Sequence, residues 1–463
     1  MNIHIAGAGG GEVTGSAYYV QTDRACVLVD CGQFQGKRES EKFNRWKPPK
    51  RIKLDAVAIT HAHLDHTGRL PLLAQKGHRV PVYATPATIE MTSLILRDSA
   101  HILAADAARK NRKLARAGEP PITPLYSPED AEGALRMMRP VPYQEPVEIA
   151  PGIRATWTEA GHMLGSASIQ LTVTEDGREK KIVFSGDLGP RSAPILRDYE
   201  PFHEADMVFI ESTYGSRNHR PFDETVEQFV TIVNDAIASG GKILVPTFAV
   251  GRAQLIASLL GWMFRNRKAT PFPIFMDSPM AIEASKIYAQ HRELFDDAAL
   301  KFIAKGTMRD ELKTMKLCVT AEDSKAINDQ PGPCLIMAGA GMCNGGRILH
   351  HFKANLWKPE THVLMVGYQA VGTLGRLLVD RAEYVKIFGE KIAVKADVHT
   401  LGGFSAHAGQ TDLLNWMGHF ADAKPKVVIT HGESASRLGL EAAIRKEFGL
   451  SCSLPNMGAV IAI

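Results

Sequence analysis

This sequence lacks cysteines at the short or regular spacings that are typical of metal sites and disulfide frameworks. Its 463 residues include six cysteines with no CxxC pair and no regular spacing, so we expect reduced, mostly buried thiols. A long apolar run is also missing, since no stretch approaches the ~18 residues of a membrane span. The N-terminus has no basic segment followed by an apolar core, so no signal peptide is expected. These absences predict a cytoplasmic protein with no membrane partner.

A large excess of charge of one sign is the next absence. The sequence has 54 basic and 50 acidic residues, and this net charge of +4 is too small to indicate a nucleic-acid partner. Any basic groove must therefore be local. Hydrophobic residues at 45% and charged residues at 22% are typical of a folded globular protein. The length exceeds a typical single core, so two domains are expected.

Glycine is concentrated near the N-terminus, in residues 7–16. This segment could be mistaken for a dinucleotide-binding fingerprint, but that motif requires a helix directly after it. The residues that follow, 17–20 and 25–30, are β-branched, aromatic and apolar, and they predict strands. We therefore expect a β-hairpin with a flexible glycine-rich connection and discount an NAD site.

The densest group of reactive side chains is in HAHLDHTGRLP, residues 61–71. Its imidazoles and carboxylate, on His61, His63, Asp65 and His66, directly follow an apolar run that predicts a buried strand. A buried polar group without a partner costs about 1–3 kcal/mol, and metal ions would satisfy all four together. His61 and His63, two residues apart, can converge on one metal. Asp65 and His66 can serve a second.

Further candidate ligands stand where other predicted strands end. The runs 156–162, 181–187 and 427–431 end in His162, Asp187 and His431. The carboxyl ends of neighbouring strands meet along one edge of a layered α/β fold, so these side chains can join the cluster. A strand-end His or Asp before glycine is also an ordinary turn residue. Only the joint pattern favours a metal site.

The combined motifs resemble those of a known family. HAHLDHTGRLP, with Asp30 upstream and GH, SGD and THGE downstream, resembles the metallo-β-lactamase fold. ESTYG at 211–215 and FSAHA at 404–408 resemble its β-CASP nuclease branch. That branch includes the endonuclease subunit of the cleavage and polyadenylation specificity factor and its prokaryotic relatives. The resemblance spans almost the whole chain.

The resemblance implies an α/β fold, a metallo-β-lactamase αββα sandwich with an inserted β-CASP α/β domain. From about residue 206, apolar strands alternate with helical segments, a βαβ rhythm that predicts a largely parallel sheet. Metal-ligand motifs resume only after residue 390. The predicted domains are 1–206 and 391–463 for the metallo-β-lactamase domain, and 207–390 for the β-CASP insertion.

The same resemblance implies a two-metal site. One metal is assigned to His61, His63 and His162, the other to Asp65, His66 and His431, with Asp187 bridging. Two Zn²⁺ are the expected cofactors, and Mn²⁺ or Fe²⁺ can occupy the same groups. Two such ions can share a hydroxide and neutralise a phosphodiester in line with attack.

The catalytic roles also follow from the resemblance. His407 is the expected general acid for the 3′ leaving oxygen, and Glu211 is expected to orient and charge its imidazole. Asp30 is expected to orient ligands by accepting hydrogen bonds, although a turn-capping Asp is an equal alternative. Ser405 is expected to hydrogen-bond the scissile phosphate.

The last motif favours RNA as the substrate. In the branch that this chain resembles, members that act on RNA have His at the position of His431. DNA-repair members such as Artemis have Val at that position. The nearby His399 is interpreted as structural.

Two glycine-rich turns, 339–347 and 367–376, follow predicted strands. Such turns can present backbone N–H groups to phosphate oxygens, with Arg347 or Arg376 adding charge. Ordinary tight turns are the alternative. A helix predicted over about 88–117 carries five basic residues in its second half, which fit either phosphate contacts or a solvated face.

The leading hypothesis is a two-zinc endoribonuclease that cuts single-stranded RNA to leave 5′-phosphate and 3′-hydroxyl ends. One alternative is a 5′-to-3′ exoribonuclease of the RNase J type. A second is a small-molecule ester or lactone hydrolase on the same metal core. A third is a catalytically idle RNA-binding scaffold. Single-stranded RNA is the expected partner, and the oligomeric state is left open, a homodimer included.

Overall fold

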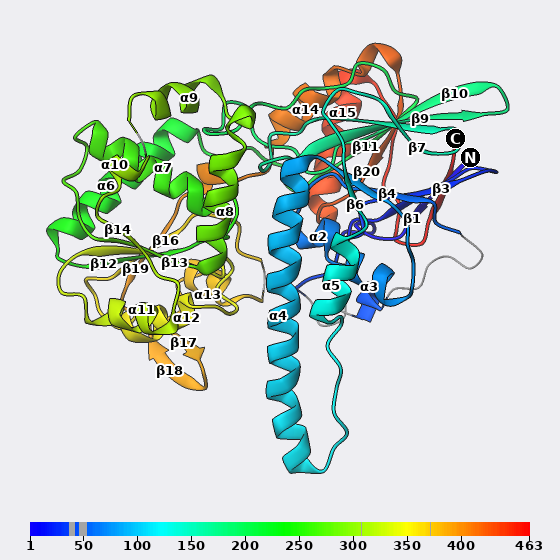
Figure 1. The fold of residues 1–463 in the computed structure, drawn as a ribbon. Helices are drawn as coiled ribbons and strands as arrows, with labels where there is room; N and C mark the ends of the chain where they lie inside the picture. The colour runs from blue at the N-terminus through cyan, green and yellow to red at the C-terminus, as the bar shows by residue number, and fades with distance from the viewer. Residues whose placement is uncertain (37–41, 46–52, 307, 371) are drawn as a thin grey trace. The chain divides into compact units, whose positions relative to one another are not determined.

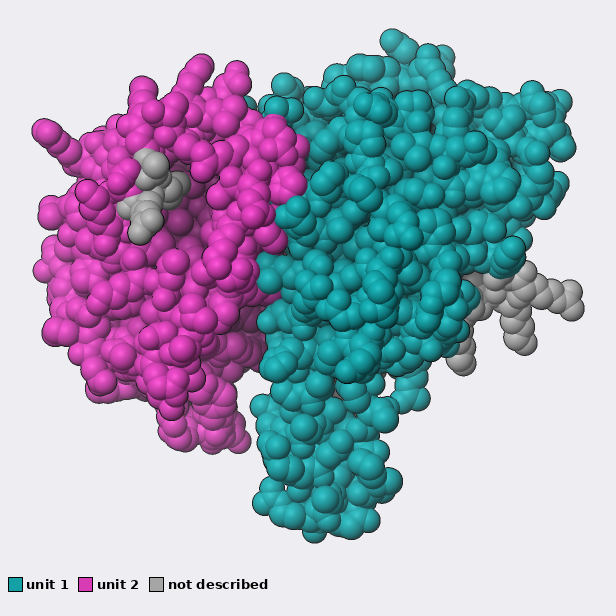
Figure 2. Space-filling view, in the orientation of Figure 1, with its two compact units in different colours: residues 1–192, 197–218, 407–463 teal, residues 193–196, 219–406 magenta. Residues whose placement is uncertain are grey.

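The computed structural model describes residues 1–36, 42–45, 53–306, 308–370 and 372–463 (Figure 1). The chain forms two compact units, which Figure 2 shows in different colours. Unit 1 consists of Met1–Ser192, Arg197–Asn218 and His407–Ile463. Unit 2 consists of Ala193–Leu196 and His219–Ala406.

Two seven-stranded sheets form the centre of unit 1 (Figure 1). In spatial order, the first contains β22 (Val460–Ala462), β1 (Asn2–Ile5), β2 (Tyr18–Gln21), β3 (Cys26–Val29), β4 (Ala56–Ala58), β5 (Val82–Ala84) and β6 (Met138–Pro140). The second contains β21 (Cys452–Ser453), β20 (Lys426–Ile429), β11 (Met207–Ile210), β10 (Arg178–Phe184), β9 (Ala167–Glu175), β8 (Ile153–Glu159) and β7 (Val147–Ala150).

Three hydrophobic clusters hold the layers of unit 1 together. One joins the inner faces of the two sheets and includes Val29, Trp157 and Phe184. The outer face of the first sheet packs against α3 (Leu70–Gln75), α4 (Pro86–Ala117) and α5 (Pro128–Leu135). The outer face of the second packs against α14 (Gln410–Gly418) and α15 (Ser434–Phe448). Alternate residues of each strand serve opposite faces, and the predicted αββα sandwich is confirmed.

The long helix predicted over about 88–117 is confirmed as α4. Thr85 caps its first turn by accepting a hydrogen bond from the Thr88 N–H, and Gly118 ends it with a left-handed φ of 69°. Beyond Ala107 its side chains are exposed or half-buried, because this end extends past the first sheet (Figure 1).

The glycine-rich N-terminal segment connects β1 and β2, which pair antiparallel as predicted. The connection itself is fixed at both ends. The Ala8 carbonyl accepts the His431 N–H at 2.9 Å, and the Ser16 N–H donates to the Asp65 carbonyl at 2.8 Å. These hydrogen bonds join the ends of the loop to the backbone of two candidate ligand residues, and the predicted flexibility of the connection stays a prediction.

Unit 2 is built on a six-stranded sheet whose recorded strand pairs are all parallel. Its order is β14 (Met315–Leu317), β13 (Ile274–Asp277), β15 (Cys334–Ala338), β12 (Lys242–Pro246), β16 (His362–Met365) and β19 (Asp397–Thr400). A separate hairpin contains β17 (Tyr384–Ile387) and β18 (Glu390–Ala393). The parallel sheet agrees with the βαβ rhythm of this part of the sequence.

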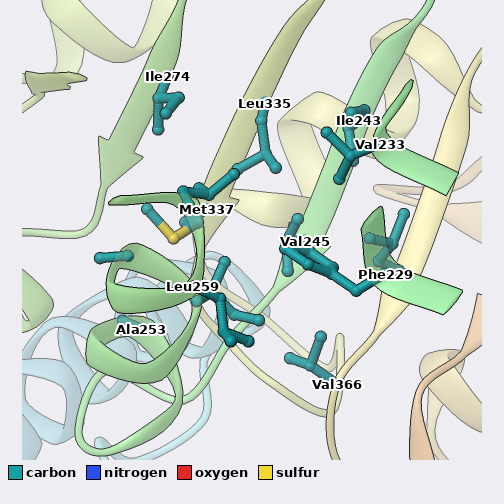
Figure 3. Packing of buried hydrophobic residues seen from close by; sticks show 14 of the residues in the cluster. Phe229, Val233, Ile243, Val245, Ala253, Leu259, Ile274, Leu335, Met337 and Val366 are labelled. Atoms are coloured by element: carbon teal, nitrogen blue, oxygen red, sulfur yellow. The ribbon is translucent and has the colours of Figure 1, made fainter. Parts of the chain in front are cut away.

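Helices cover both faces of this sheet. One face packs against α6 (Phe222–Ala238), α7 (Arg252–Arg265) and α8 (Pro279–Gln290), as Figure 3 shows for Val245, Leu259 and Met337. The opposite face packs against α12 (Ile348–Asn355) and α13 (Leu374–Val379). The remaining helices of the described chain are α2 (Leu64–Thr67), α9 (Asp297–Ala304), α10 (Met308–Glu311), α11 (Ala321–Ala326) and five short 3₁₀ turns.

The units divide at positions other than the predicted domain boundaries of 206/207 and 390/391. Met207–Ile210, read from the sequence as the first strand of the insertion, is β11 and pairs in parallel with β10 and β20 of unit 1. Asp397–Thr400 is β19 and pairs with β16 of unit 2. The main crossings between the units are at Asn218/His219 and Ala406/His407, and the short segment Ala193–Leu196 also belongs to unit 2.

The six cysteines are unpaired, and five of them are buried. This agrees with the predicted reduced, mostly buried thiols. Burial raises the pKa of the Cys31 and Cys343 thiols to about 12, so these thiols are protonated at neutral pH. Among the described helices, none combines the length and the apolar character required to cross a membrane.

Candidate metal centre

The candidate ligands stand at the carboxyl ends of strands in both sheets of unit 1. β4 leads into His61 and α2, and β8 leads through Gly161 into His162. β10 leads into Asp187 and the parallel β20 into His431. β11 lies between β10 and β20 and leads into Glu211. Side chains from distant parts of the sequence therefore meet at one edge of the sandwich.

The seven candidate ligands form two groups that share one carboxylate. Within each group, one ligand atom from each residue lies within 4.8 Å of all the others. The first group contains His61, His63, His162 and Asp187, and the second contains Asp65, His66, Asp187 and His431. This grouping is the one predicted from the family motifs. The role of each residue as a metal ligand stays a prediction.

In the first group, Nε2 of His162 lies 3.1 Å from Nδ1 of His63 and 3.7 Å from Oδ2 of Asp187. The same Oδ2 lies 3.5 Å from Nε2 of His61. Ligand atoms around one tetrahedral Zn²⁺ are separated by similar distances, because each stands about 2.0–2.2 Å from the metal.

In the second group, the other carboxylate oxygen of Asp187 faces two histidines. Its Oδ1 lies 3.4 Å from Nε2 of His66 and 3.4 Å from Nδ1 of His431. Oδ2 of Asp65 lies 3.5 Å from Nε2 of His431. Asp187 thus offers one oxygen to each group, which is the arrangement that a bridging carboxylate requires.

Two buried atoms of these groups, Nε2 of His61 and Oδ1 of Asp187, have no hydrogen-bond partner among the described residues. Leaving such groups unpaired is costly, and a metal ion would satisfy both. The donors are imidazole nitrogens and carboxylate oxygens, the set that zinc and similar divalent cations prefer. The residues therefore fit a dinuclear metal site.

Protonation differs between the two groups. In the first, burial lowers the pKa of His63 to about 4 and that of His61 well below its usual value. Both imidazoles are therefore neutral, as metal ligands must be. In the second, burial is the largest influence and opposes the charged forms of His66 and His431, but the nearby carboxylates, Asp187 first among them, together raise both pKa values. The carboxylates of the second group therefore favour positive charge beside them, which a bound cation can supply in place of protons on the two imidazoles.

Asp30 contacts the second group through the His66 nitrogen that faces away from Asp187. It follows β3 with a left-handed φ of 56° and is 1% exposed. Its Oδ1 accepts the Thr60 N–H at 2.8 Å, and its Oδ2 lies 2.7 Å from Nδ1 of His66. These contacts leave Nε2 of His66 directed at the Asp187 carboxylate. They are what the predicted orienting role requires.

His407 and Glu211 form an ion pair beside the first group. Nδ1 of His407 lies 3.3 Å from Oε1 of Glu211 and 3.9 Å from Oδ2 of Asp187. Burial disfavours the His407 imidazolium, but the carboxylates of Glu211, Asp187 and Asp65, Glu211 first among them, together raise the pKa of His407. Glu211 is itself fixed, because it accepts the N–H groups of Leu188 and Thr213 at 2.8 and 3.1 Å.

Several supporting residues were missed by the sequence analysis. The Thr60 hydroxyl bonds Asp30 at 2.9 Å and lies 3.1 Å from Nδ1 of His61. The Thr213 hydroxyl lies 3.3 Å from Nδ1 of His431. Thr60 directly precedes HAHLDHTGRLP and Thr213 lies within ESTYG, and these positions were their only signal in the sequence. Their contacts depend on tertiary structure.

The predicted phosphate contacts, Ser405, Arg347 and Arg376, all belong to unit 2. The Arg347 guanidinium donates to Asp277 at 2.7 Å and to the carbonyls of Cys318 and Val319 at 2.9 and 2.7 Å. Arg376 pairs with Asp380 at 2.9 Å. Arg347 therefore binds its own unit's backbone, which favours a structural role over the predicted one. Ser405 and Arg376 stay predictions.

A third histidine–aspartate group, in unit 2, contains His362, Asp397 and His399. Nδ1 of His362 and Nε2 of His399 are 3.1 Å apart, and the ring centroids are 5.4 Å apart with planes inclined by 11°. The distance between the centroids equals the distance between the two nitrogens plus the distance from each nitrogen to the centre of its own ring, so the four points lie nearly on one line. The nitrogens therefore face each other directly, as in an N–H···N hydrogen bond.

The same nitrogen distance has a different meaning in the first ligand group. There the rings of His63 and His162 have centroids 5.0 Å apart and planes inclined by 80°. The ring axes meet at an angle, so the nitrogen lone pairs can converge on one ion. The His362–His399 pair is instead assigned as a hydrogen bond, in line with the structural role expected for His399.

Family models match most of the chain. The model for the metallo-beta-lactamase superfamily matches residues 10–247 and the Beta-Casp domain model matches residues 253–378. The model for a Zn-dependent metallo-hydrolase RNA specificity domain matches residues 391–455. Together the three models include every candidate ligand and both members of the His407–Glu211 pair.

The chain is also similar to characterised proteins. It is 40% identical to "Ribonuclease TTHA0252" of Thermus thermophilus over 93% of each chain. It is 31% identical to "Transcription termination factor FttA" of Cenarchaeum symbiosum over 98% of this chain and 70% of that one. A solved structure of a protein of unknown function from Enterococcus faecalis has the same fold, with a TM-score of 0.55, 12% identity and coverage of 100% and 99%.

Proposed function

Because the chain belongs to the metallo-β-lactamase superfamily, with a β-CASP domain and an RNA specificity domain, we propose that it is a metal-dependent endoribonuclease. The observation that carries the proposal is the pair of ligand groups sharing Asp187, with the Glu211–His407 pair beside them. When bound, two divalent cations supply Lewis acidity to a phosphodiester and lower the pKa of a water molecule. Zinc is the cation proposed first.

Proton transfer to the leaving group falls to His407. Its imidazolium is held at Nδ1 by the Glu211 carboxylate, and Nε2 donates a proton to the 3′ oxygen as the P–O3′ bond breaks. Glu211 raises the pKa of His407, which favours the imidazolium, and holds the ring through Nδ1. A water oxygen forms the new bond to phosphorus and its proton passes to solvent, so breaking the P–O3′ bond leaves 5′-phosphate and 3′-hydroxyl ends.

RNA is the proposed substrate because the RNA specificity domain and the similarity to a named ribonuclease both favour it. His431 occupies the position where RNA-directed members of the branch carry histidine. An internal cut in single-stranded RNA is the proposed mode, and 5′-to-3′ exonuclease action of the RNase J type is its rival. An idle scaffold is disfavoured, because all seven ligand positions are filled and brought together.

The test uses zinc-loaded protein and an internally labelled single-stranded RNA with a blocked 5′ end. Wild type and the matched control His419→Ala, an exposed histidine outside the site, should release internal fragments. His407→Ala should retain its metal and lose roughly 10²–10⁴ in rate, which is the usual contribution of a general acid.

Two results would replace the proposal. Cleavage only after the 5′ block is removed would establish the exonuclease. No cleavage of either RNA, together with turnover of carboxylic esters or lactones, would establish a small-molecule hydrolase. Reloading the protein with Mn²⁺ or Fe²⁺ and comparing rates identifies the cation that supports the reaction.

A further inference from the structure

Phe248 in unit 2 is a large apolar residue held toward solvent from an otherwise buried segment. It follows β12 and is 40% exposed, whereas Thr247, Ala249 and Val250 are at most 7% exposed. β12 lies between β15 and β16 in the parallel sheet. The turns after these strands therefore meet at the carboxyl edge, where ligands bind in open α/β sheets.

Glycines from the two flanking strands pack against the Phe248 ring. A Cβ placed on Gly341, in the turn after β15, would lie 2.6 Å from Cδ2 of the ring. A Cβ on Gly367, directly after Val366 at the end of β16, would lie 3.6 Å from the ring. Neither glycine has a left-handed φ. The close approach of the ring, and not a special backbone conformation, therefore accounts for glycine at position 341.

A buried amide joins the two glycine turns. Gln369 is 6% exposed, and its Nε2 donates to the Gly341 carbonyl at 2.9 Å and to the Gly367 carbonyl at 3.2 Å. The turns are thus fixed relative to each other and to the ring that they contact. The core continues beneath them through Val245, Met337 and Val366 (Figure 3). Phe248 is therefore an aromatic surface on a rigid support.

We propose that Phe248 is a binding site for one base of the RNA, which stacks on the exposed part of the ring. This inference rests on the proposed function and adds a subsite to it. Aromatic side chains stack with any base, because every base has a π face. Stacking on a ring that is already held in place requires little ordering on binding. The site would therefore contribute affinity with little sequence preference.

The test measures binding of a fluorescent single-stranded RNA to metal-loaded protein carrying His407→Ala, in which turnover is slowed enough for binding to be measured before cleavage. In this background, Phe248→Leu should weaken binding roughly 5- to 150-fold, the range measured for base–aromatic stacking. Phe248→Tyr should bind like the parent, because it keeps the ring. Tyr384→Leu, which removes another exposed aromatic of unit 2, is the matched control and should also bind like the parent.

A series of RNAs with one abasic residue at successive positions locates the base without altering the protein. One position should weaken binding to Phe248 protein and have no further effect on Phe248→Leu. Equal binding by Phe248→Leu, or equal effects of all abasic positions, overturns the stacking site and leaves the proposed function standing. Failure of the Phe248 protein to bind any RNA overturns both. Circular dichroism of each variant excludes misfolding as the cause.

Discussion

His407 and Glu211, separated by nearly two hundred positions in the sequence, form an ion pair in which Nδ1 of the imidazole lies 3.3 Å from Oε1 of the carboxylate. Glu211 is 1% exposed and fixed by two backbone N–H groups. The pair therefore links the charge of the proposed general acid to a rigid part of the sandwich.

The pH dependence of cleavage tests this pair. A general acid must be protonated, so activity falls as the pH rises through the pKa of His407. Burial lowers that pKa, and the Glu211 carboxylate, together with Asp187 and Asp65, raises it above its usual value. Glu211→Gln removes the charge, so the alkaline loss of kcat should begin at a lower pH than in wild type. His419→Ala is the control. An unchanged alkaline limb in Glu211→Gln would exclude the proposed role.

Metal content tests the bridging position of Asp187. Asp187 contributes to both ligand groups, whereas Asp65 contributes only to the second. Asp187→Ala should therefore lose metal from both groups, and Asp65→Ala should lose about one equivalent, since each site needs its full ligand set. Mass spectrometry of the purified proteins measures this, with the exposed Asp422→Ala as control. Full metal content in Asp187→Ala would contradict the shared site.

Substitution of Asp30 tests whether the hydrogen bonds that orient a candidate ligand, His66, are needed for metal binding. Asn tolerates the left-handed backbone found at this position, so Asp30→Asn changes mainly the charge that faces His66 and Thr60. Loss of such an orienting partner typically weakens metal binding 10–100-fold. Titration with a chelator measures the affinity directly. Wild-type affinity in Asp30→Asn would assign Asp30 to turn capping alone.

Gly32 tests the packing of the loops against α2. A Cβ at this position would lie 1.6 Å from the Asp65 carbonyl oxygen, so Gly32→Ala must displace one of the two segments. Overpacking of this kind typically costs about 1–3 kcal/mol. We expect a lower unfolding temperature and weaker metal binding.

Gly345→Ala is the control, because a Cβ there meets no atom within 4 Å and the φ is not left-handed. It should change stability little, or raise it slightly by restricting the unfolded chain. Equal stability of Gly32→Ala and wild type would mean that the loop and α2 can separate freely.

The fold was largely predictable where local patterns are strong. The apolar run before His61 predicted a buried strand, the periodic segment up to Ala117 predicted α4, and the βαβ rhythm predicted a parallel sheet. The predicted domain boundaries differ from the units of the structure where strand pairing decides to which unit a segment belongs. Met207–Ile210 has the composition of any buried strand, and only its pairing with β10 and β20 places it in unit 1.

The candidate site was likewise predictable in part from the sequence. Its chemistry was determined by the sequence, because His61, His63, Asp65 and His66 are close enough along the chain to exclude most other roles. Their distant partners were recognisable as strand ends and family motifs, but their grouping depends on the order β20-β11-β10-β9-β8. That order results from packing across the whole sandwich, which no local segment encodes.

The sequence by itself thus determined which side chains could bind metal and move a proton, since these properties belong to residue types and short spacings. The tertiary structure decided which atoms face each other: the oxygens of Asp187 between the two groups, and Arg347 against backbone carbonyls. It also decided that Phe248 rests between two glycine turns. Such contacts form only when distant strands pair, because hydrophobic burial and hydrogen bonding across layers fix positions that chain order leaves free.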